Sequence, residues 1–159
     1  MENMIQYEPL EQIMRLEKGM SLSESVEFVR GLLKQMEEIQ KTGHLYLEQY
    51  LLKTGFRPPE VAMGYEERIG KQSDYYFAVA VFYYCLTGRK ITRLQMFRSS
   101  IPDITGVICQ NSMKDDAVSI LYKILKKGLA PVLRNRYQSL EQMKEDFAEL
   151  EKCYGEEIE

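Results

Sequence analysis

The chain has 159 residues, three cysteines and a net charge of −3 at pH 7. Its length suits one domain, so we treat residues 1–159 as a single domain. The acidic balance provides no broad basic field, which argues against nucleic acid and against an anionic membrane as partners. An odd number of cysteines without repeated spacing argues against a disulfide framework. The first 12 residues lack the basic start and apolar core of a secretion signal, so we expect a cytoplasmic protein.

The N-terminal part predicts two helices. A short helix within residues 1–20 is interrupted at Gly19. A longer helix starts after Ser21, which matches a capping box with Glu24, and apolar residues then recur at helical spacing until Gly43. Its other face is polar, so we expect this helix to pack from one side against the apolar helix described below.

Residues 43–72 have no sustained hydrophobic period and are punctuated by four glycines and two prolines, which are Gly43, Gly55, Pro58, Pro59, Gly64 and Gly70. We expect an irregular connection here. Within it, residues 45–52 fit either a brief strand or a turn of helix. Residues 59–63 fit one helical turn, because proline is tolerated at the first position of a helix.

Residues 71–89 contain a long uninterrupted run of apolar and aromatic residues. The run is too short for a membrane span, which takes about 20 apolar residues. It predicts a helix that is buried on all sides, with Ser73 as its cap, Asp74 at the positive end of its dipole and Gly88 at a left-handed exit. Cys85 lies in this run and is expected to be a core residue rather than a nucleophile.

The C-terminal part predicts further helices. We expect a short helix over residues 92–97, a loop over 99–106, and a helix from Asp115 that Gly128 closes. Ser139 matches a second capping box with Gln142 ahead of a last helix, and residues 155–159 form an acidic tail that we expect to be frayed. The fold class is therefore all-α, built around the buried helix.

Motifs of enzymatic sites are absent from the sequence. The one histidine, His44, lies next to a glycine in a predicted surface turn. No His, Cys, Asp or Glu residues cluster at metal-ligand spacing, and the glycines form neither a GxGxxG nor a Walker pattern. We expect neither a metal nor a cofactor.

Three segments, in order, resemble the C-terminal half of the helical lobe of eukaryotic-like bacterial serine/threonine protein kinases. These are GFRPPEVAMG at 55–64, SDYYFAVAVFYYCLTGR at 73–89 and ILKKGLAPVLRNRYQSLEQMKEDFAEL at 124–150. The resemblance implies that Glu60 belongs to an Ala-Pro-Glu-like motif and forms a buried ion pair with Arg136. It also implies that Asp74 holds the backbone of the catalytic loop.

The same resemblance implies that the catalytic parts are degenerate. Tyr46 stands at the position of the loop histidine and Glu48 at that of the catalytic aspartate. Counterparts of the magnesium site, the activation segment and the N-terminal lobe are missing. Phosphoryl transfer rests on positioning ATP and its metals, so we expect no ATP binding and no enzymatic activity.

The resulting expectation is a truncated pseudokinase-like domain that acts by binding protein. The surface that an N-terminal lobe would cover is either an interface, with a homodimer as the simplest version, or is refolded over the gap. The residues concerned are Tyr46, Leu47, Tyr50, Leu51, Leu52 and Phe56. One alternative is a kinase with Glu48 as base, active only when a partner chain supplies the N-terminal lobe and the metal site. Another is a regulator that binds an authentic kinase or a kinase substrate through residues 92–97 and the following loop.

Overall fold

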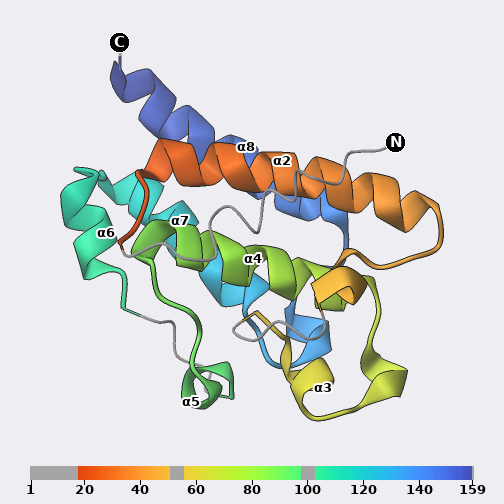
Figure 1. Ribbon diagram of the computed structural model, residues 1–159. Helices are drawn as coiled ribbons and strands as arrows, with labels where there is room; N and C mark the ends of the chain where they lie inside the picture. Colours follow the sequence, from red (N-terminus) through yellow and green to blue (C-terminus); the bar gives the residue numbers. More distant parts are fainter. Residues whose placement is uncertain (1–17, 51–55, 98–102, 159) are drawn as a thin grey trace.

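The computed structural model describes residues 18–50, 56–97 and 103–158. Within these ranges the regular structure is helical and no strand occurs, which confirms the all-α class. Four long helices form the core, and short helical turns connect them (Figure 1). The long helices are α2 (Leu22–Lys41), α4 (Lys71–Thr87), α7 (Asp115–Gly128) and α8 (Leu140–Ile158). The short helix predicted ahead of Gly19 lies outside the described residues.

Helix α4 is the centre of the fold. Its residues from Ser73 to Leu86 are all buried, as its apolar sequence predicts. Helices α2 and α7 pack directly against it, and α8 packs against both of them. Figure 1 shows α2 and α8 lying alongside each other on one side of α4. The described helices thus enclose α4.

The two ends of α4 differ in how well the sequence predicts them. The helix begins at Lys71 with Gly70 as its cap, so the prediction of Ser73 as the cap is wrong. Ser73 lies in the first turn, where its Oγ accepts a hydrogen bond from the Gly70 N–H at 3.1 Å and donates one to Glu60 at 2.6 Å. The predicted left-handed exit is present at Gly88, which has a φ of 73°.

Helix α2 has the predicted start and the predicted polar face. The Ser21 Oγ accepts from the Glu24 N–H at 3.2 Å, and the Glu24 carboxylate accepts from the Ser21 N–H at 3.1 Å, which confirms the capping box. The apolar face packs against α4 and α8. Its buried apolar residues are Leu22, Val26, Val29, Leu32, Leu33 and Met36. The predicted contact with the central helix is therefore confirmed, and α8 is an additional neighbour.

Helix α7 approaches α4 closely at Gly128. The sequence predicts that this glycine closes the helix, and it is the last helical residue. A Cβ atom at this position would lie 2.2 Å from Cγ2 of Val79 in α4, far inside van der Waals contact. Glycine is therefore needed at position 128 because the backbone of α7 meets the side chain of Val79 there.

Only one of the two hydrogen bonds of the predicted capping box is present at the start of α8. The Gln142 N–H donates to the Ser139 Oγ at 3.2 Å, whereas the Gln142 side chain accepts from the Gln138 N–H at 3.0 Å. The helix continues through Ile158, so the backbone of residues 155–158 is helical, and the prediction that this tail frays stays a prediction. Glutamates are good helix formers, which explains the extension.

The connections contain short helical turns. Those at 59–62 and 93–96 confirm predictions, and residues 46–50 adopt the helical alternative rather than a strand. The turn at 105–110 was missed, because residues 99–106 were expected to form a loop. The elements are η2 (Tyr46–Tyr50), α3 (Pro59–Ala62), η3 (Glu66–Arg68), α5 (Arg93–Met96), α6 (Thr105–Gln110) and η4 (Leu133–Asn135). None of the helices in the described ranges is both long and apolar enough to cross a membrane.

Candidate functional site

The expected ion pair between Glu60 and Arg136 is present in the core. The Arg136 Nη1 lies 2.7 Å from Oε2 of Glu60, and its Nη2 lies 3.1 Å from Oε1, so the contact is bidentate. The two side chains are 0% and 3% exposed. A planar guanidinium that meets a carboxylate in this way forms one of the stronger polar contacts in proteins.

Further hydrogen bonds complete the surroundings of this pair. The Arg136 Nε donates to the carbonyl of Ala130 at 2.9 Å, and Nη1 also donates to the carbonyl of Gln72 at 3.1 Å. The guanidinium carbon lies 5.1 Å from the centre of the Tyr76 ring, which belongs to α4. The pair therefore connects α3, the start of α4 and the segment before α8.

Asp74 makes the second buried polar centre. Its carboxylate accepts from the backbone N–H of Tyr46 at 2.8 Å, from that of Leu47 at 2.9 Å and from the side-chain amide of Gln40 at 2.9 Å. Burial raises the pKa of Asp74 above its ordinary value, and these hydrogen bonds oppose that rise. The carboxylate thus holds the start of η2 against α4, which is the contact that the kinase resemblance implies for this residue.

The residues expected at an interface are partly core residues. Tyr46, Leu47 and Phe56 are only 1–2% exposed, so the prediction that they form an accessible surface is wrong. The Phe56 ring lies 5.9 Å from that of Phe77 and 5.5 Å from that of Tyr84, both in α4. Of the two alternatives for the surface that an N-terminal lobe would cover, an interface or a refolded segment, the refolded segment describes these three residues. Leu51, Leu52 and the Tyr50 side chain lie outside the described residues.

Glu48 lies at the surface next to His44. The carboxylate Oε1 is 3.4 Å from the Nδ1 of His44, and both side chains are exposed. The residue at the predicted position of the catalytic base is therefore exposed, and its charge adds to the rise in the pKa of the nearby buried Asp74. Its charge is solvated.

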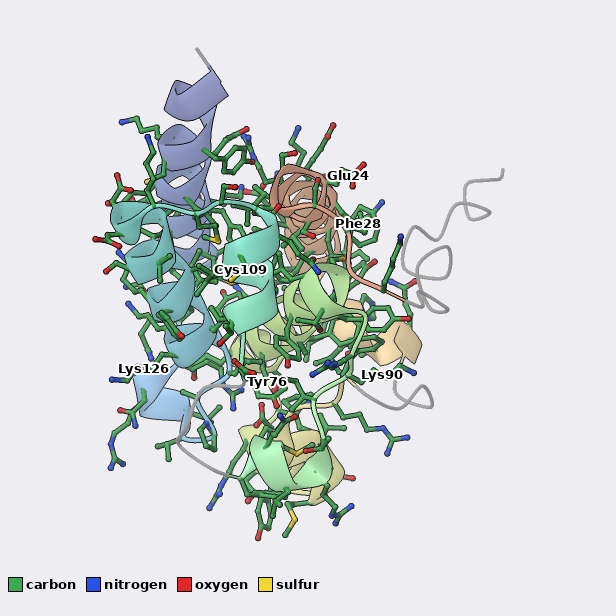
Figure 2. The ribbon with its side chains drawn as sticks, turned by 90° about the vertical axis from the view of Figure 1, so that its left-hand side faces the viewer. Glu24, Phe28, Tyr76, Lys90, Cys109 and Lys126 are labelled. Atoms are coloured by element: carbon green, nitrogen blue, oxygen red, sulfur yellow. The ribbon has the colours of Figure 1, made fainter. Side chains whose placement is uncertain are left out.

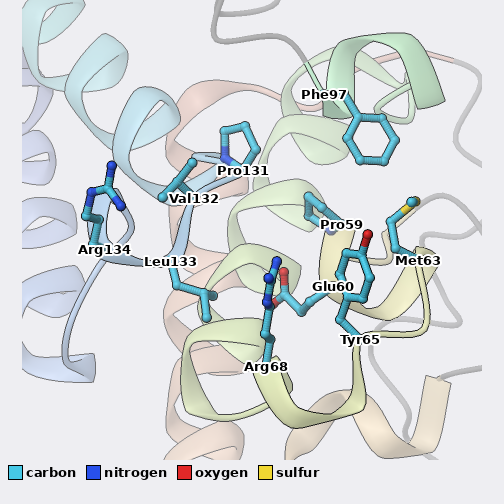
Figure 3. A pocket seen from close by; sticks show the side chains of 10 residues that line it. All are labelled: Pro59, Glu60, Met63, Tyr65, Arg68, Phe97, Pro131, Val132, Leu133 and Arg134. Atoms are coloured by element: carbon cyan, nitrogen blue, oxygen red, sulfur yellow. The ribbon is translucent and has the colours of Figure 1, made fainter.

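A pocket of about 480 Å³ opens next to the Glu60 and Arg136 pair. Side chains from α3, from the segment after it and from Phe97, which follows α5, stand opposite those of the segment at 131–134, as Figure 3 shows. Large apolar side chains around it are exposed by 40–47%. These residues are Met63, Tyr65, Phe97 and Val132.

Two arginines also line this pocket. The Arg68 guanidinium carbon lies 4.7 Å from the centre of the Tyr65 ring. Arg134 belongs to the opposite wall (Figure 3). Neither arginine makes an ion pair with another described residue. The pocket is therefore apolar with positive charge on two sides.

A second pocket of about 440 Å³ lies next to the first one, and Pro131 lines both. Its other lining residues are Lys123, Lys126, Lys127, Ala130 and Asn135. Lys126 stands at the edge of the molecule in Figure 2, whereas Tyr76 lies inside it. Neither pocket is lined by Glu48 or by the expected interface residues.

Sequence reasoning missed most of this exposed group of residues. Only Phe97 falls in a segment, residues 92–97, that was considered as a binding surface. Met63, Tyr65 and Val132 follow or precede short helical turns, where the sequence has no period that would assign them to a face. The one available signal is that large apolar residues occur in segments rich in Gly and Pro.

No protein-family model, curated protein or solved structure matches this chain. The likeness to the helical lobe of protein kinases therefore stays a prediction, based on its motifs. Among the residues that the structure describes, no group of three or more His, Cys, Asp or Glu side chains is placed to hold a metal ion.

Proposed function

We propose that this chain is a non-catalytic, kinase-derived helical domain that acts by binding a protein partner, such as an authentic kinase or another signalling protein. The observation that carries the proposal is the distribution of large apolar side chains. Those at the position of a kinase catalytic loop belong to the core, whereas four others remain exposed around one pocket.

The proposed absence of catalysis is supported by the residues at the position of the kinase catalytic loop. Tyr46 is 1% exposed, and its ring lies 5.9 Å from that of Phe77. Its backbone N–H is occupied by Asp74. Tyr46 therefore supports the fold, and Glu48, which stands where the catalytic base is expected, lies at the surface beside His44 and lines neither of the two pockets.

Protein binding is supported by the exposed residues at the pocket. Contiguous apolar patches on a protein surface commonly mark interaction sites, and partner side chains that fill such pockets contribute most of the binding energy. The pocket lies beside the buried ion pair, so rigid contacts hold its wall at Glu60. A preformed wall reduces the entropy that binding costs.

Photochemical cross-linking tests the proposal in the cells that naturally express the chain. A photoreactive phenylalanine analogue is placed at Phe97, which lines the pocket, and in a control at Tyr122 of α7, which lines neither pocket. The two side chains are similarly exposed, at 47% and 38%. We expect a specific protein adduct from position 97 only. Equal adducts from both positions, or none from position 97, would contradict the proposal.

Thermal unfolding with ATP and magnesium separates this proposal from an enzyme. A ligand at 100 times its dissociation constant stabilises a protein by about 2.7 kcal/mol. We expect the melting temperature of the isolated chain to stay the same when ATP and magnesium are added. A rise in the melting temperature would favour a nucleotide-binding function instead.

A further inference from the structure

We propose that the partner segment that occupies this pocket is an acidic peptide segment with a large apolar anchor side chain. This inference rests on the proposed function and specifies the chemistry of the partner. Two features carry it: the apolar lining of the first pocket, and the positive charges that surround both pockets.

The apolar anchor follows from the lining of the first pocket. Pro59, Pro131 and Leu133 add to the four exposed apolar side chains around a volume of about 480 Å³. Such a volume accommodates an aromatic or long aliphatic side chain. The one acidic side chain among the lining residues is Glu60, and Arg136 neutralises it.

The acidic character follows from cations without carboxylate partners. Among the described residues, Arg68, Arg134, Lys126 and Lys127 make no ion pair. Lys127 lies 5.2 Å from the centre of the Tyr137 ring, which attracts the cation but carries no negative charge. Lys123 differs, since Asp146 and Glu149 both contact it.

These cations gather on one part of a chain whose net charge is −3. Because Pro131 lines both pockets, a peptide anchored in the first one can extend over this proline toward the lysines. Carboxylates next to the anchor would then meet Arg68 on one side and Arg134 on the other. Such complementarity steers association and sets specificity.

Charge also argues against two other occupants. A two-fold symmetric homodimer through this pocket would place two copies of the same lining against each other, and its charged side chains without an ion pair are both arginines, so positive charge would meet positive charge. Nucleic acid has the required negative charge, but its backbone offers no side chain for an apolar pocket. A peptide with both features fits the lining best.

The experiment is a selection from a random 12-residue peptide library displayed on phage, with the full chain as the target. We expect enrichment of sequences in which Asp or Glu residues flank an aromatic or aliphatic residue. The variant Arg68→Glu with Arg134→Glu should bind the selected peptides about tenfold more weakly in fluorescence anisotropy, since each reversed charge removes an attraction and adds a repulsion.

The control variant is Lys34→Glu with Lys152→Glu, which changes the charge equally on α2 and α8. We expect it to bind the peptides like the natural chain, and circular dichroism should show the same fold for both variants. Enrichment of basic or uncharged peptides, no enrichment, or equal loss in the control would overturn the inference. If one of these outcomes occurs while cross-linking from position 97 still captures a protein, the inferred chemistry of the partner is wrong and the proposed protein-binding function stands.

Discussion

The Arg136 side chain joins segments that are far apart in the sequence. It binds the carboxylate of Glu60 and the carbonyls of Gln72 and Ala130, and it is buried completely. Removal of the guanidinium therefore leaves the Glu60 carboxylate and these two carbonyls without this donor at once. The loss of stability is large because such a change leaves a charge buried without an opposite charge beside it.

We expect Arg136→Ala to lower the free energy of unfolding by about 3–5 kcal/mol, because the Glu60 carboxylate would stay buried without its partner. Urea denaturation measures this change. The control is Arg30→Ala, which removes the exposed pair with Glu151 and should change stability by less than about 1 kcal/mol. Equal effects of the two variants would show that burial does not determine the strength of the inner pair.

Asp74→Ala removes an acceptor for three donors. The loss of a helix cap costs about 1 kcal/mol, whereas each buried donor left unsatisfied costs about 1–3 kcal/mol. We therefore expect Asp74→Ala to lower the free energy of unfolding by about 3 kcal/mol or more. Ser21→Ala, which removes only the cap of α2, is the comparison in the same urea titration. A cost no larger than that of Ser21→Ala would mean that the contacts to Tyr46 and Leu47 contribute little.

Cys85 should be chemically inert in the folded chain. Its thiol is buried in α4, and burial raises its pKa to about 12, which suppresses the reactive thiolate. We expect iodoacetamide at pH 8 to modify the exposed Cys109 and to leave Cys85 unmodified until denaturant is added. Mass spectrometry of the digested protein detects both sites. Rapid modification of Cys85 without denaturant would contradict its place in the core.

At the scale of elements, the contact between α4 and α7 depends on the missing side chain of Gly128. Alanine is a better helix former by about 1 kcal/mol, but its Cβ would overlap Val79. We expect Gly128→Ala to destabilise the protein by about 1–3 kcal/mol, the usual cost of overpacking. Gly31→Ala in α2 is the matched control, because no side chain and no other segment of the chain lies within 4 Å of its Cβ position, apart from its two chain neighbours. It should stabilise the chain slightly in the same thermal denaturation series.

The long helices could be predicted because several local signals agree for each of them. The capping box of Ser21, the apolar run of α4 and the exit at Gly88 are readable from neighbouring residues. The start of α4 was misplaced because Ser73 has a distant partner, Glu60, and no local pattern reveals such a contact. The turn α6 was missed for a related reason, since six residues are too few to establish a helical period.

The predicted interface shows the same limit. An apolar residue next to a shortened connection has the same sequence pattern whether it packs inward or outward, and Tyr46, Leu47 and Phe56 pack inward. The pocket could not be predicted because its walls come from three separate segments of the chain. In contrast, the Glu60 and Arg136 pair could be anticipated from the kinase resemblance, which carries long-range information.

For the whole molecule, two phenylalanines distinguish residues that support the fold from residues available to a partner. Phe56 is 1% exposed and contacts aromatic rings of α4, whereas Phe97 is 47% exposed at the pocket. We expect Phe56→Ala to cost about 3–5 kcal/mol of stability and Phe97→Ala to change it by less than about 1 kcal/mol. Urea denaturation of both variants checks this difference. A large loss for Phe97→Ala would assign that residue to the fold instead of the proposed binding surface.

Arg136 follows Glu60 by 76 positions, and this separation orders the completion of the fold during synthesis. A chain that emerges from the ribosome presents α3 and α4 before the guanidinium that neutralises Glu60 has been made. Until then the carboxylate has the Ser73 hydroxyl but no cation as a partner, and burying a charge without an opposite charge is costly. We therefore expect the domain to close only after the segment ahead of α8 has emerged, and a nascent chain that stalls before Arg136 to stay open at α3.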